Sequence, residues 1–286
     1  MIVRCFGARG SIPVSGPEYV RFGGDSTCIE LRSAADEVLV VDAGSGIRRL
    51  GKRLLAEGRL RLTMLFTHSH WDHILGFPFF KPIYDERAEI DIHGCPLEQG
   101  DMRKLLAETM NPPHFPVPFD QLAARLTYHA EASCALKVGG IEVTSIPLSH
   151  PNLGAGYRFS EGGKSFVLLT DNELAHRHRG GRSFEEYADF ARGADLLFHD
   201  AEFTPEEYPS RRGWGHSTHI DAVDLAIAAG VRRFGLVHHN QDRGDEEVAA
   251  LVEDCRVRVA AAGLDMEVFG ATQETEVALQ PALPRP

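Results

Sequence analysis

The chain contains the stretch Phe66-Thr67-His68-Ser69-His70-Trp71-Asp72-His73, directly after the apolar run 62–66. Three imidazoles and one carboxylate, side chains that zinc prefers as ligands, therefore fall within six residues at the end of an expected strand. Because four such groups cannot all face one ion comfortably, the stretch predicts two metal ions side by side. The alternative is a solvated loop that is rich in histidine by chance.

Three further candidate ligands follow later apolar runs. His150 comes after the run 141–148, Asp171 ends the run 166–171, and His238 ends the run 234–238. Such short runs predict buried strands, and in an α/β sheet ligands meet at the carboxyl ends of the strands. The sequence therefore predicts that these side chains meet those of the 66–73 stretch.

This set matches the pattern H-x-H-x-D-H followed by a distant His, Asp and His, and it resembles the metallo-β-lactamase-fold superfamily. The resemblance runs from Cys5 to about Phe269. It implies an α/β fold, the four-layer αββα sandwich, and two divalent metal ions, Zn²⁺ being expected and Mn²⁺ or Fe being alternatives. It also implies a metal-bridging hydroxide as the nucleophile, because two cations lower the pKa of water from 15.7 towards about 7.

The resemblance further implies which residues bind each ion. One ion would be held by three imidazoles and the other by two imidazoles and a carboxylate, with one carboxylate bridging them: His68, His70 and His150; Asp72, His73 and His238; and Asp171. His239 is a rival to His238, but the ligand of the superfamily directly follows the strand.

Two later motifs indicate a branch of this superfamily. Leu196-Leu197-Phe198-His199-Asp200-Ala201-Glu202-Phe203 and Gly215-His216-Ser217-Thr218 are similar to the paired H-E-A-T and G-H-S-T motifs of the ribonuclease Z and cyclic phosphodiesterase branch. The resemblance implies that His216 faces the scissile phosphate and that Asp200 orients it, which makes Asp72, His216 and Asp200 the catalytic candidates. Asp200 replaces the Glu of the motif and shortens its reach by one methylene. Helix capping is the alternative role for the His216 segment.

The spacing between the motifs bears on the substrate. Twenty residues separate His150 from Asp171, and they predict a plain hairpin around Glu161-Gly162-Gly163-Lys164. The long basic arm of the ribonuclease Z proteins that process precursor tRNA is missing there, and the formal charge of −11 attracts no phosphate backbone overall. We therefore expect a phosphodiesterase that cleaves a small anionic phosphodiester, cyclic ones included, and we do not expect long nucleic acid as a partner.

Two other functions remain open. The same metals could hydrolyse a thioester or a lactone, because the fold does not determine the reaction. The chain could also be a non-catalytic ligand-binding module, although such a module has no need of all seven ligands.

Composition agrees with an ordinary enzyme. With 286 residues, 43% hydrophobic and 25% charged, the chain can bury a large core, and we expect a single hydrolase domain over residues 1–286. Five dispersed cysteines without a C-x-x-C pair predict buried, reduced thiols and a cytoplasmic protein. We find no signal segment and no run of membrane length, so no membrane is expected. A homodimer is allowed but not indicated.

The apolar pattern predicts two strand-rich halves, each followed by helices. The expected helices are 47–57, 218–229 with Thr218 as its N-cap, and 245–261, and the expected strands are 2–6, 27–31, 38–41, 62–66, 135–138, 141–146, 156–159, 166–169, 196–199, 234–237 and 266–269. The segment Gly100 to His129 is either a lid over the site or a passive surface connection. The roles of His176, His178 and His219 stay open.

Overall fold

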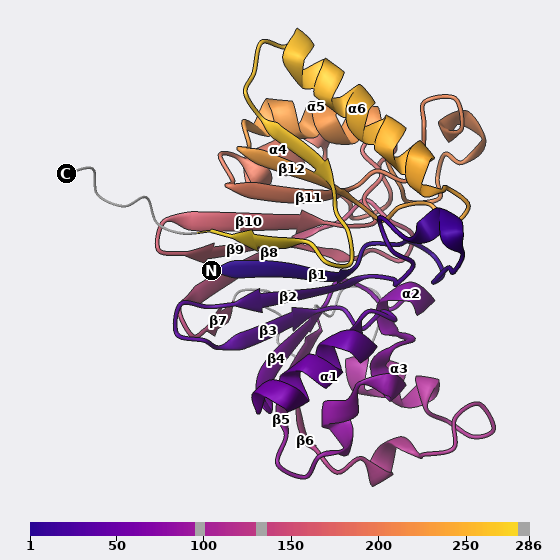
Figure 1. Cartoon of the computed structure of the whole chain (residues 1–286), viewed down its shortest axis with the longest axis vertical. Coiled ribbons are helices and arrows are strands. Elements are labelled where there is room, and N and C mark those ends of the chain that lie inside the picture. The colour runs from indigo at the N-terminus through magenta and orange to yellow at the C-terminus, as the bar shows by residue number, and fades with distance from the viewer. Residues whose placement is uncertain (95–100, 130–135, 280–286) are drawn as a thin grey trace.

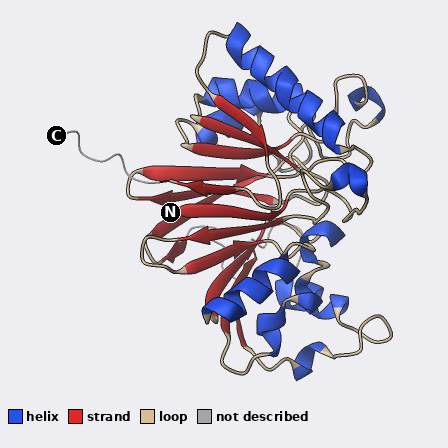
Figure 2. Cartoon of the chain, in the orientation of Figure 1, coloured by secondary structure: helices blue, strands red, loops and turns tan. Residues whose placement is uncertain are grey.

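The computed structural model describes residues 1–94, 101–129 and 136–279, and in it two mixed β-sheets face each other between outer helices (Figures 1 and 2). The N-terminal sheet has the order β14 (Glu276–Ala278), β1 (Ile2–Gly7), β2 (Cys28–Arg32), β3 (Val38–Val41), β4 (Arg61–Phe66), β5 (Glu89–Gly94) and β6 (Arg125–His129). The C-terminal sheet has the order β13 (Glu267–Gly270), β12 (Arg233–Val237), β11 (Leu196–Asp200), β10 (Lys164–Leu169), β9 (Ala155–Glu161), β8 (Ile141–Pro147) and β7 (Leu136–Val138).

The helices divide between the two outer faces. Those beside the N-terminal sheet are α1 (Ile47–Glu57), α2 (Trp71–Ile74) and α3 (Met102–Thr109), with the 3-10 turns η2 (Phe77–Phe79), η3 (Lys81–Tyr84) and η4 (Phe119–Gln121). Those beside the C-terminal sheet are α4 (Phe184–Ala191), α5 (His219–Ala229) and α6 (Asp245–Ala261). The short turns η1 (Pro17–Tyr19) and η5 (Tyr208–Ser210) lie in loops.

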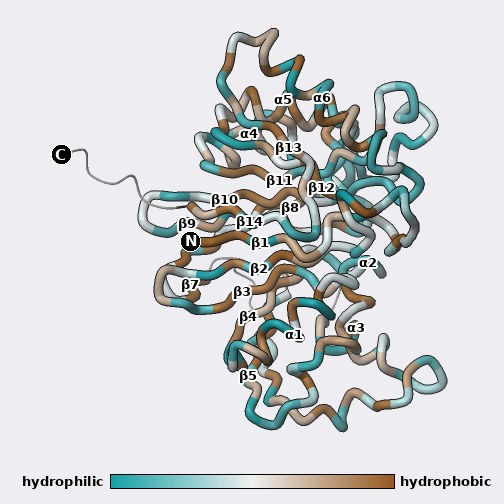
Figure 3. The backbone as a smooth tube through the Cα atoms, in the orientation of Figure 1, coloured by the Kyte–Doolittle hydropathy of each residue, from teal (hydrophilic) through white to brown (hydrophobic). Residues whose placement is uncertain are grey.

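Three apolar clusters separate four layers. One lies between α1 and the N-terminal sheet, with Leu50 and Met64 among its members. A second lies between the two sheets and includes Leu31 and Phe166. The third joins the C-terminal sheet to α4, α5 and α6. Figure 3 shows the same division, with hydrophobic colour along the strands and hydrophilic colour gathered in the loops. The predicted αββα sandwich is therefore confirmed.

The parallel parts of both sheets place the ends of their strands at one edge. Strands β3 to β6 are parallel in one sheet and β10 to β13 in the other. The stretch that begins with Thr67 leaves β4, Asp171 follows the end of β10 by two residues, and His238 follows β12 directly. This arrangement is what brings distant parts of the sequence to one site.

Most expected elements are present, with boundaries that agree or differ by at most two residues. Helices 47–57 and 245–261 are confirmed, and the third begins at His219 with Thr218 as its N-cap, whose side chain accepts from the Asp221 amide. The strand expected at 27–31 lies at 28–32, and the one expected at 266–269 lies at 267–270. Ala135, the expected start of β7, lies outside the described residues. The prediction missed β5, β6, β14, α4 and the short helix α2.

The described part of the 100–129 segment belongs to the outer layer. Leu106 and Met110 are fully buried in the same cluster as α1, and Phe115 packs edge-on against Phe79. In the described part of the chain this segment contributes no side chain to the groups that could hold a metal. These contacts favour the passive connection over the lid. No helix among the described residues combines the length and the apolar character that a bilayer span requires.

Candidate metal centre and active site

The seven predicted ligands meet in two adjoining groups. In each group the ligand atoms lie within 4.8 Å of one another, and the groups are His68, His70 and His150, and Asp72, His73, Asp171 and His238. Asp171 lies between the two groups, with its Oδ1 3.3 Å from Nε2 of His73 and its Oδ2 3.5 Å from Nε2 of His68. The structure therefore brings together all seven residues, and it puts Asp171 where one carboxylate could reach both sides.

Three acidic or basic residues at strand ends have a left-handed backbone. The φ angles are 62° at Asp42, 50° at Asp171 and 57° at His238. A positive φ in a residue other than glycine costs of order 1–3 kcal/mol and persists where the surroundings impose it, most often at functional sites. At these strand ends it turns each side chain towards the cluster.

Hydrogen bonds on the far side of the imidazoles fix which nitrogen faces the cluster. Nδ1 of His73 donates to Asp42 at 2.8 Å, and Nδ1 of His238 donates to Glu202 at 2.9 Å. Nδ1 of His150 donates to the carbonyl of Gly215 at 3.0 Å. Each of these rings therefore presents Nε2 to the cluster, which is the usual arrangement of histidine ligands and their supporting partners.

The protonation of the cluster suits a cation. Burial lowers the pKa of His150 to about 3, which keeps its imidazole in the neutral, ligating form. Burial would also lower the pKa of His73, but the carboxylates of Asp72 and Asp171 outweigh it and raise that pKa. The same carboxylates therefore draw positive charge into the centre, and a divalent ion would supply it.

The residues fit two divalent ions. Nε2 of His68 and of His73 are buried without a hydrogen-bond partner, although both point into the cluster. A buried polar atom without a partner is costly, and a coordinated cation would satisfy it. The donor set of imidazole nitrogens and carboxylate oxygens is the one that zinc prefers.

His216 lies against this centre, and Asp200 holds it. Its Nδ1 donates to Oδ2 of Asp200 at 2.9 Å, and its ring stacks on His238 with centroids 4.7 Å apart. Its ring also lies 5.3 Å from that of His150. Burial would lower the pKa of His216, but the carboxylates of Glu202 and Asp200 raise it to about 9. The shorter Asp therefore still reaches the imidazole.

A turn after β1 closes another side of the centre. The amide of Ser11 donates to Oδ2 of Asp72 at 3.0 Å. A Cβ at Gly10 would lie 2.3 Å from the ring of His238, so only glycine fits this approach. The stretch Gly7 to Ser11 therefore lines the site.

Other histidines lie outside the ligand groups. His239 donates from Nε2 to the carbonyl of Ala271, and His178 pairs with Glu173. His219 is buried, with Nε2 3.4 Å from Asp254. His176 packs edge-on against His178. None of these four belongs to the groups found among the described residues.

Three acidic residues that support the site were not predicted from the sequence. Asp42 directly follows β3, as His238 follows β12, so the signal used for the ligands could have found it. Glu202 replaces the Thr of the H-E-A-T motif and binds His238, and that departure from the motif was a signal too. Glu173 gave no such signal, because the two backbone amides that it binds, those of Gly213 and Gly215, lie in a loop about forty residues away.

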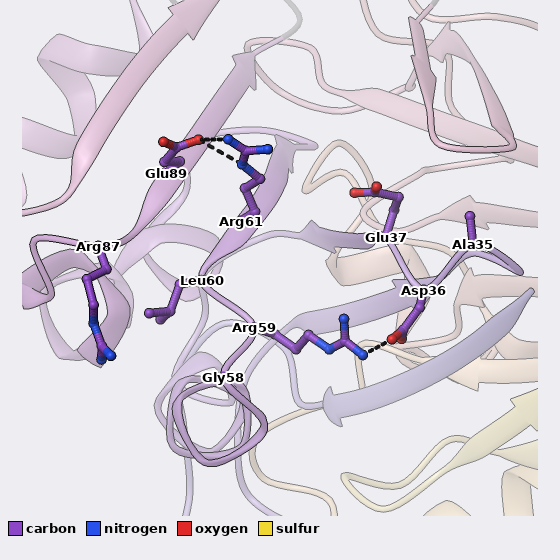
Figure 4. A pocket seen from close by; sticks show the side chains of 9 residues that line it. All are labelled: Ala35, Asp36, Glu37, Gly58, Arg59, Leu60, Arg61, Arg87 and Glu89. Atoms are coloured by element: carbon purple, nitrogen blue, oxygen red, sulfur yellow. Dashed lines mark hydrogen bonds and ion pairs between the residues drawn. The ribbon is translucent and has the colours of Figure 1, made fainter.

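A hollow of about 460 Å³ lies away from this centre, at the opposite ends of the strands (Figure 4). It is lined by residues before or at the start of β3, β4 and β5: Ala35, Asp36, Glu37, Gly58, Arg59, Leu60, Arg61, Arg87 and Glu89. Its arginines are paired, Arg59 with Asp36 and Arg61 with Glu89, while Arg87 binds Asp85. These ion pairs neutralise its three arginines, and we assign it no function.

Comparisons with known proteins agree with this geometry. The model of the beta-lactamase superfamily domain matches residues 38–239. Ribonuclease Z of Halorubrum lacusprofundi is 27% identical over 244 residues, which are 70% of this chain and 76% of that protein.

Solved structures show the same fold. Human tRNase Z, short form, has a TM-score of 0.62 at 19% identity, with 98% of this chain and 100% of that chain covered. A diphosphatase from the PhnP family has a TM-score of 0.66 at 19% identity, with 98% of each chain covered. The family match covers most of the chain, from β3 to the residue after His238. The chain therefore belongs to the beta-lactamase superfamily domain family, and both its relatives and its cluster of imidazoles and carboxylates are consistent with a metal-dependent hydrolase.

Proposed function

We propose that this chain is a phosphodiesterase with two metal ions that hydrolyses a small phosphodiester, cyclic ones included. The observation that carries the proposal is His216, an imidazole held by Asp200 at the edge of the seven-ligand cluster. A metal centre alone would serve any hydrolase of this fold, whereas an additional imidazole beside it suits a phosphate, whose oxygens carry charge.

Each residue has a role in this proposal. His68, His70 and His150 would hold one ion, Asp72, His73 and His238 the other, and Asp171 both. Two divalent cations bound there supply Lewis acidity and a water of lowered pKa. His216 presents the edge of its ring opposite the Asp200 contact to the substrate, where it stabilises phosphate charge or protonates the departing oxygen.

The region between His150 and Asp171 supports a small substrate. It forms a hairpin of β9 and β10, and the turn between Glu161 and Lys164 consists of two glycines. A basic arm that would grip RNA is not part of this hairpin. The formal charge of −11 also disfavours a long polyanion.

RNA is the second candidate substrate, because the similar curated proteins carry the name ribonuclease Z. A thioester or lactone is the third, because the fold supports more than one reaction.

The three described cysteines, Cys5, Cys28 and Cys255, are buried and free, which supports our expectation of a reducing, cytoplasmic compartment.

The test is a substrate comparison with protein of known metal content. Purified chain loaded with zinc or manganese is assayed on bis(p-nitrophenyl) phosphate, on 2′,3′-cyclic and 3′,5′-cyclic nucleotides, on thioesters and on lactones. We expect turnover of at least one diester that His216→Ala reduces while metal content stays the same. Turnover of a thioester or lactone alone, independent of His216, would contradict the proposal.

A further inference from the structure

Glu173 is a buried acid whose carboxylate accepts four hydrogen bonds, and it has no role in the proposed function. Its side chain lies two residues past Asp171, and the residue is 1% exposed. Oε1 accepts from the Tyr208 hydroxyl and from the Gly213 amide, both at 2.7 Å. Oε2 accepts from the Gly215 amide and from Nε2 of His178, both at 2.8 Å. One carboxylate therefore fastens two loops, 204–215 and 176–181, beside the metal centre.

Gly215 connects this carboxylate to the metal ligand His150. Its amide donates to Glu173, and its carbonyl accepts from Nδ1 of His150 at 3.0 Å. Its φ is +98°, and a Cβ there would lie 2.0 Å from Nδ1 of His150, so the backbone must pass at this distance and only glycine can do so. Glu173 thus binds the amide of Gly215, and the carbonyl of the same residue orients the imidazole of His150.

We infer that Glu173 is a positioning residue: by holding Gly215 it fixes the His150 imidazole for the ion of the His68, His70 and His150 group. This inference rests on the metal binding of the proposed function and is independent of the substrate. The single residue Gly215 links Glu173 to His150. A shift of the Gly215 backbone would therefore move the carbonyl that His150 binds. Partners of this kind typically change metal affinity by about 10- to 100-fold when removed.

A Gln at this position cannot replace the carboxylate. Its amide has one oxygen and one NH₂ group, so in either orientation the NH₂ faces a backbone N–H, that of Gly213 or that of Gly215. Glu207 offers a matched control in the same loop. It accepts from the Thr204 amide at 2.8 Å and from Nη2 of Arg243 at 2.7 Å, and these contacts do not involve Gly215.

The experiment is a zinc titration of metal-free wild type, Glu173→Gln and Glu207→Gln against a chromophoric chelator. We expect two equivalents in the wild type and in Glu207→Gln with the same affinities. In Glu173→Gln one equivalent should bind about 10- to 100-fold more weakly, and the other should be unchanged. Glu173→Asp, which keeps the charge but cannot span both amides, should give the same change to a smaller degree and replaces the Gln variant if that variant does not fold.

A double-mutant cycle with His150→Ala separates positioning from general loosening of the fold. If Glu173 acts through His150, Glu173→Gln should weaken zinc binding no further in the His150→Ala background. Unchanged affinities in folded Glu173→Gln or Glu173→Asp, or additive losses in the cycle, would overturn the inference. A wild type that binds two zinc ions but cleaves no diester would defeat the proposed function and leave this inference standing. A wild type that binds no zinc would defeat both.

Discussion

The metal centre buries polar and charged side chains, which an apolar core would not contain. His68, Asp72, His73, Asp171 and His238 are each at most 3% exposed and lie in direct contact. Burying charged or polar groups costs several kcal/mol unless they are paired or bind a metal. The residues of the centre therefore suit a metal site, and they differ in whether they would bind a metal ion or act beside it.

Asp171→Ala should remove at least one ion together with the activity. The carboxylate reaches both ligand groups, so its loss removes a ligand from each. Elemental analysis of wild type should find about two transition-metal ions per chain, and the variant should hold fewer. A variant that keeps two ions and full turnover would show that Asp171 does not bridge.

His216→Ala should keep the metals and lose rate. Its Nδ1 is committed to Asp200, so we do not expect it to ligate, and kcat on a diester should fall by roughly 10² to 10⁴, the range for losing a positioned acid. Elemental analysis and steady-state kinetics on the same preparation measure both effects. Loss of an ion would instead make His216 a ligand, and unchanged kinetics would reduce it to a helix-capping role.

Secondary-structure elements position these residues, and the sequence predicted those with a strong apolar pattern. The strands that precede the ligands, β4, β8, β10 and β12, are five to seven residues long and rich in apolar residues, and so they were found. β5 and β6 were missed because edge and near-edge strands alternate with polar residues, as in Glu89–Gly94, where exposed Asp91 lies between buried Ile90 and Ile92. Among the site residues, those that follow a strand were predictable, whereas Glu173 depends on a loop contact that no local pattern encodes.

Helix α4 was missed although its sequence carries a start signal. Ser183 accepts from the Glu186 amide, and Glu186 accepts from the Ser183 amide, which is a capping box. Ser183→Ala should therefore lower the free energy of unfolding by about 1 kcal/mol. Urea denaturation monitored by circular dichroism measures this change.

The same variant should leave metal content unchanged, because α4 packs on the outer face of the C-terminal sheet. Glu185→Gln is the matched control, because Glu185 is exposed in the same helix and the substitution leaves the capping box intact. Equal stability of Ser183→Ala and Glu185→Gln would mean that the capping box contributes nothing measurable.

At the scale of the whole molecule, two sheets bring ligands from four distant parts of the chain to one edge. The segment of the chain between His150 and Asp171 is a short hairpin. The first half supplies the stretch after β4, and the second half supplies His150, Asp171 and His238. Such a centre forms only when the two sheets pack, so its metal content also reports on the complete fold.

The most direct test compares a small diester with precursor tRNA on the same two-metal preparation at low and at physiological salt. A protein that grips RNA neutralises several phosphates, and its affinity falls with a log-log slope of about −0.7 per phosphate on single strands. We predict a higher kcat/KM for the small diester, with only a weak dependence on salt. Efficient and strongly salt-sensitive cleavage of a precursor tRNA 3′ extension, with a higher kcat/KM than any small diester, would contradict the account.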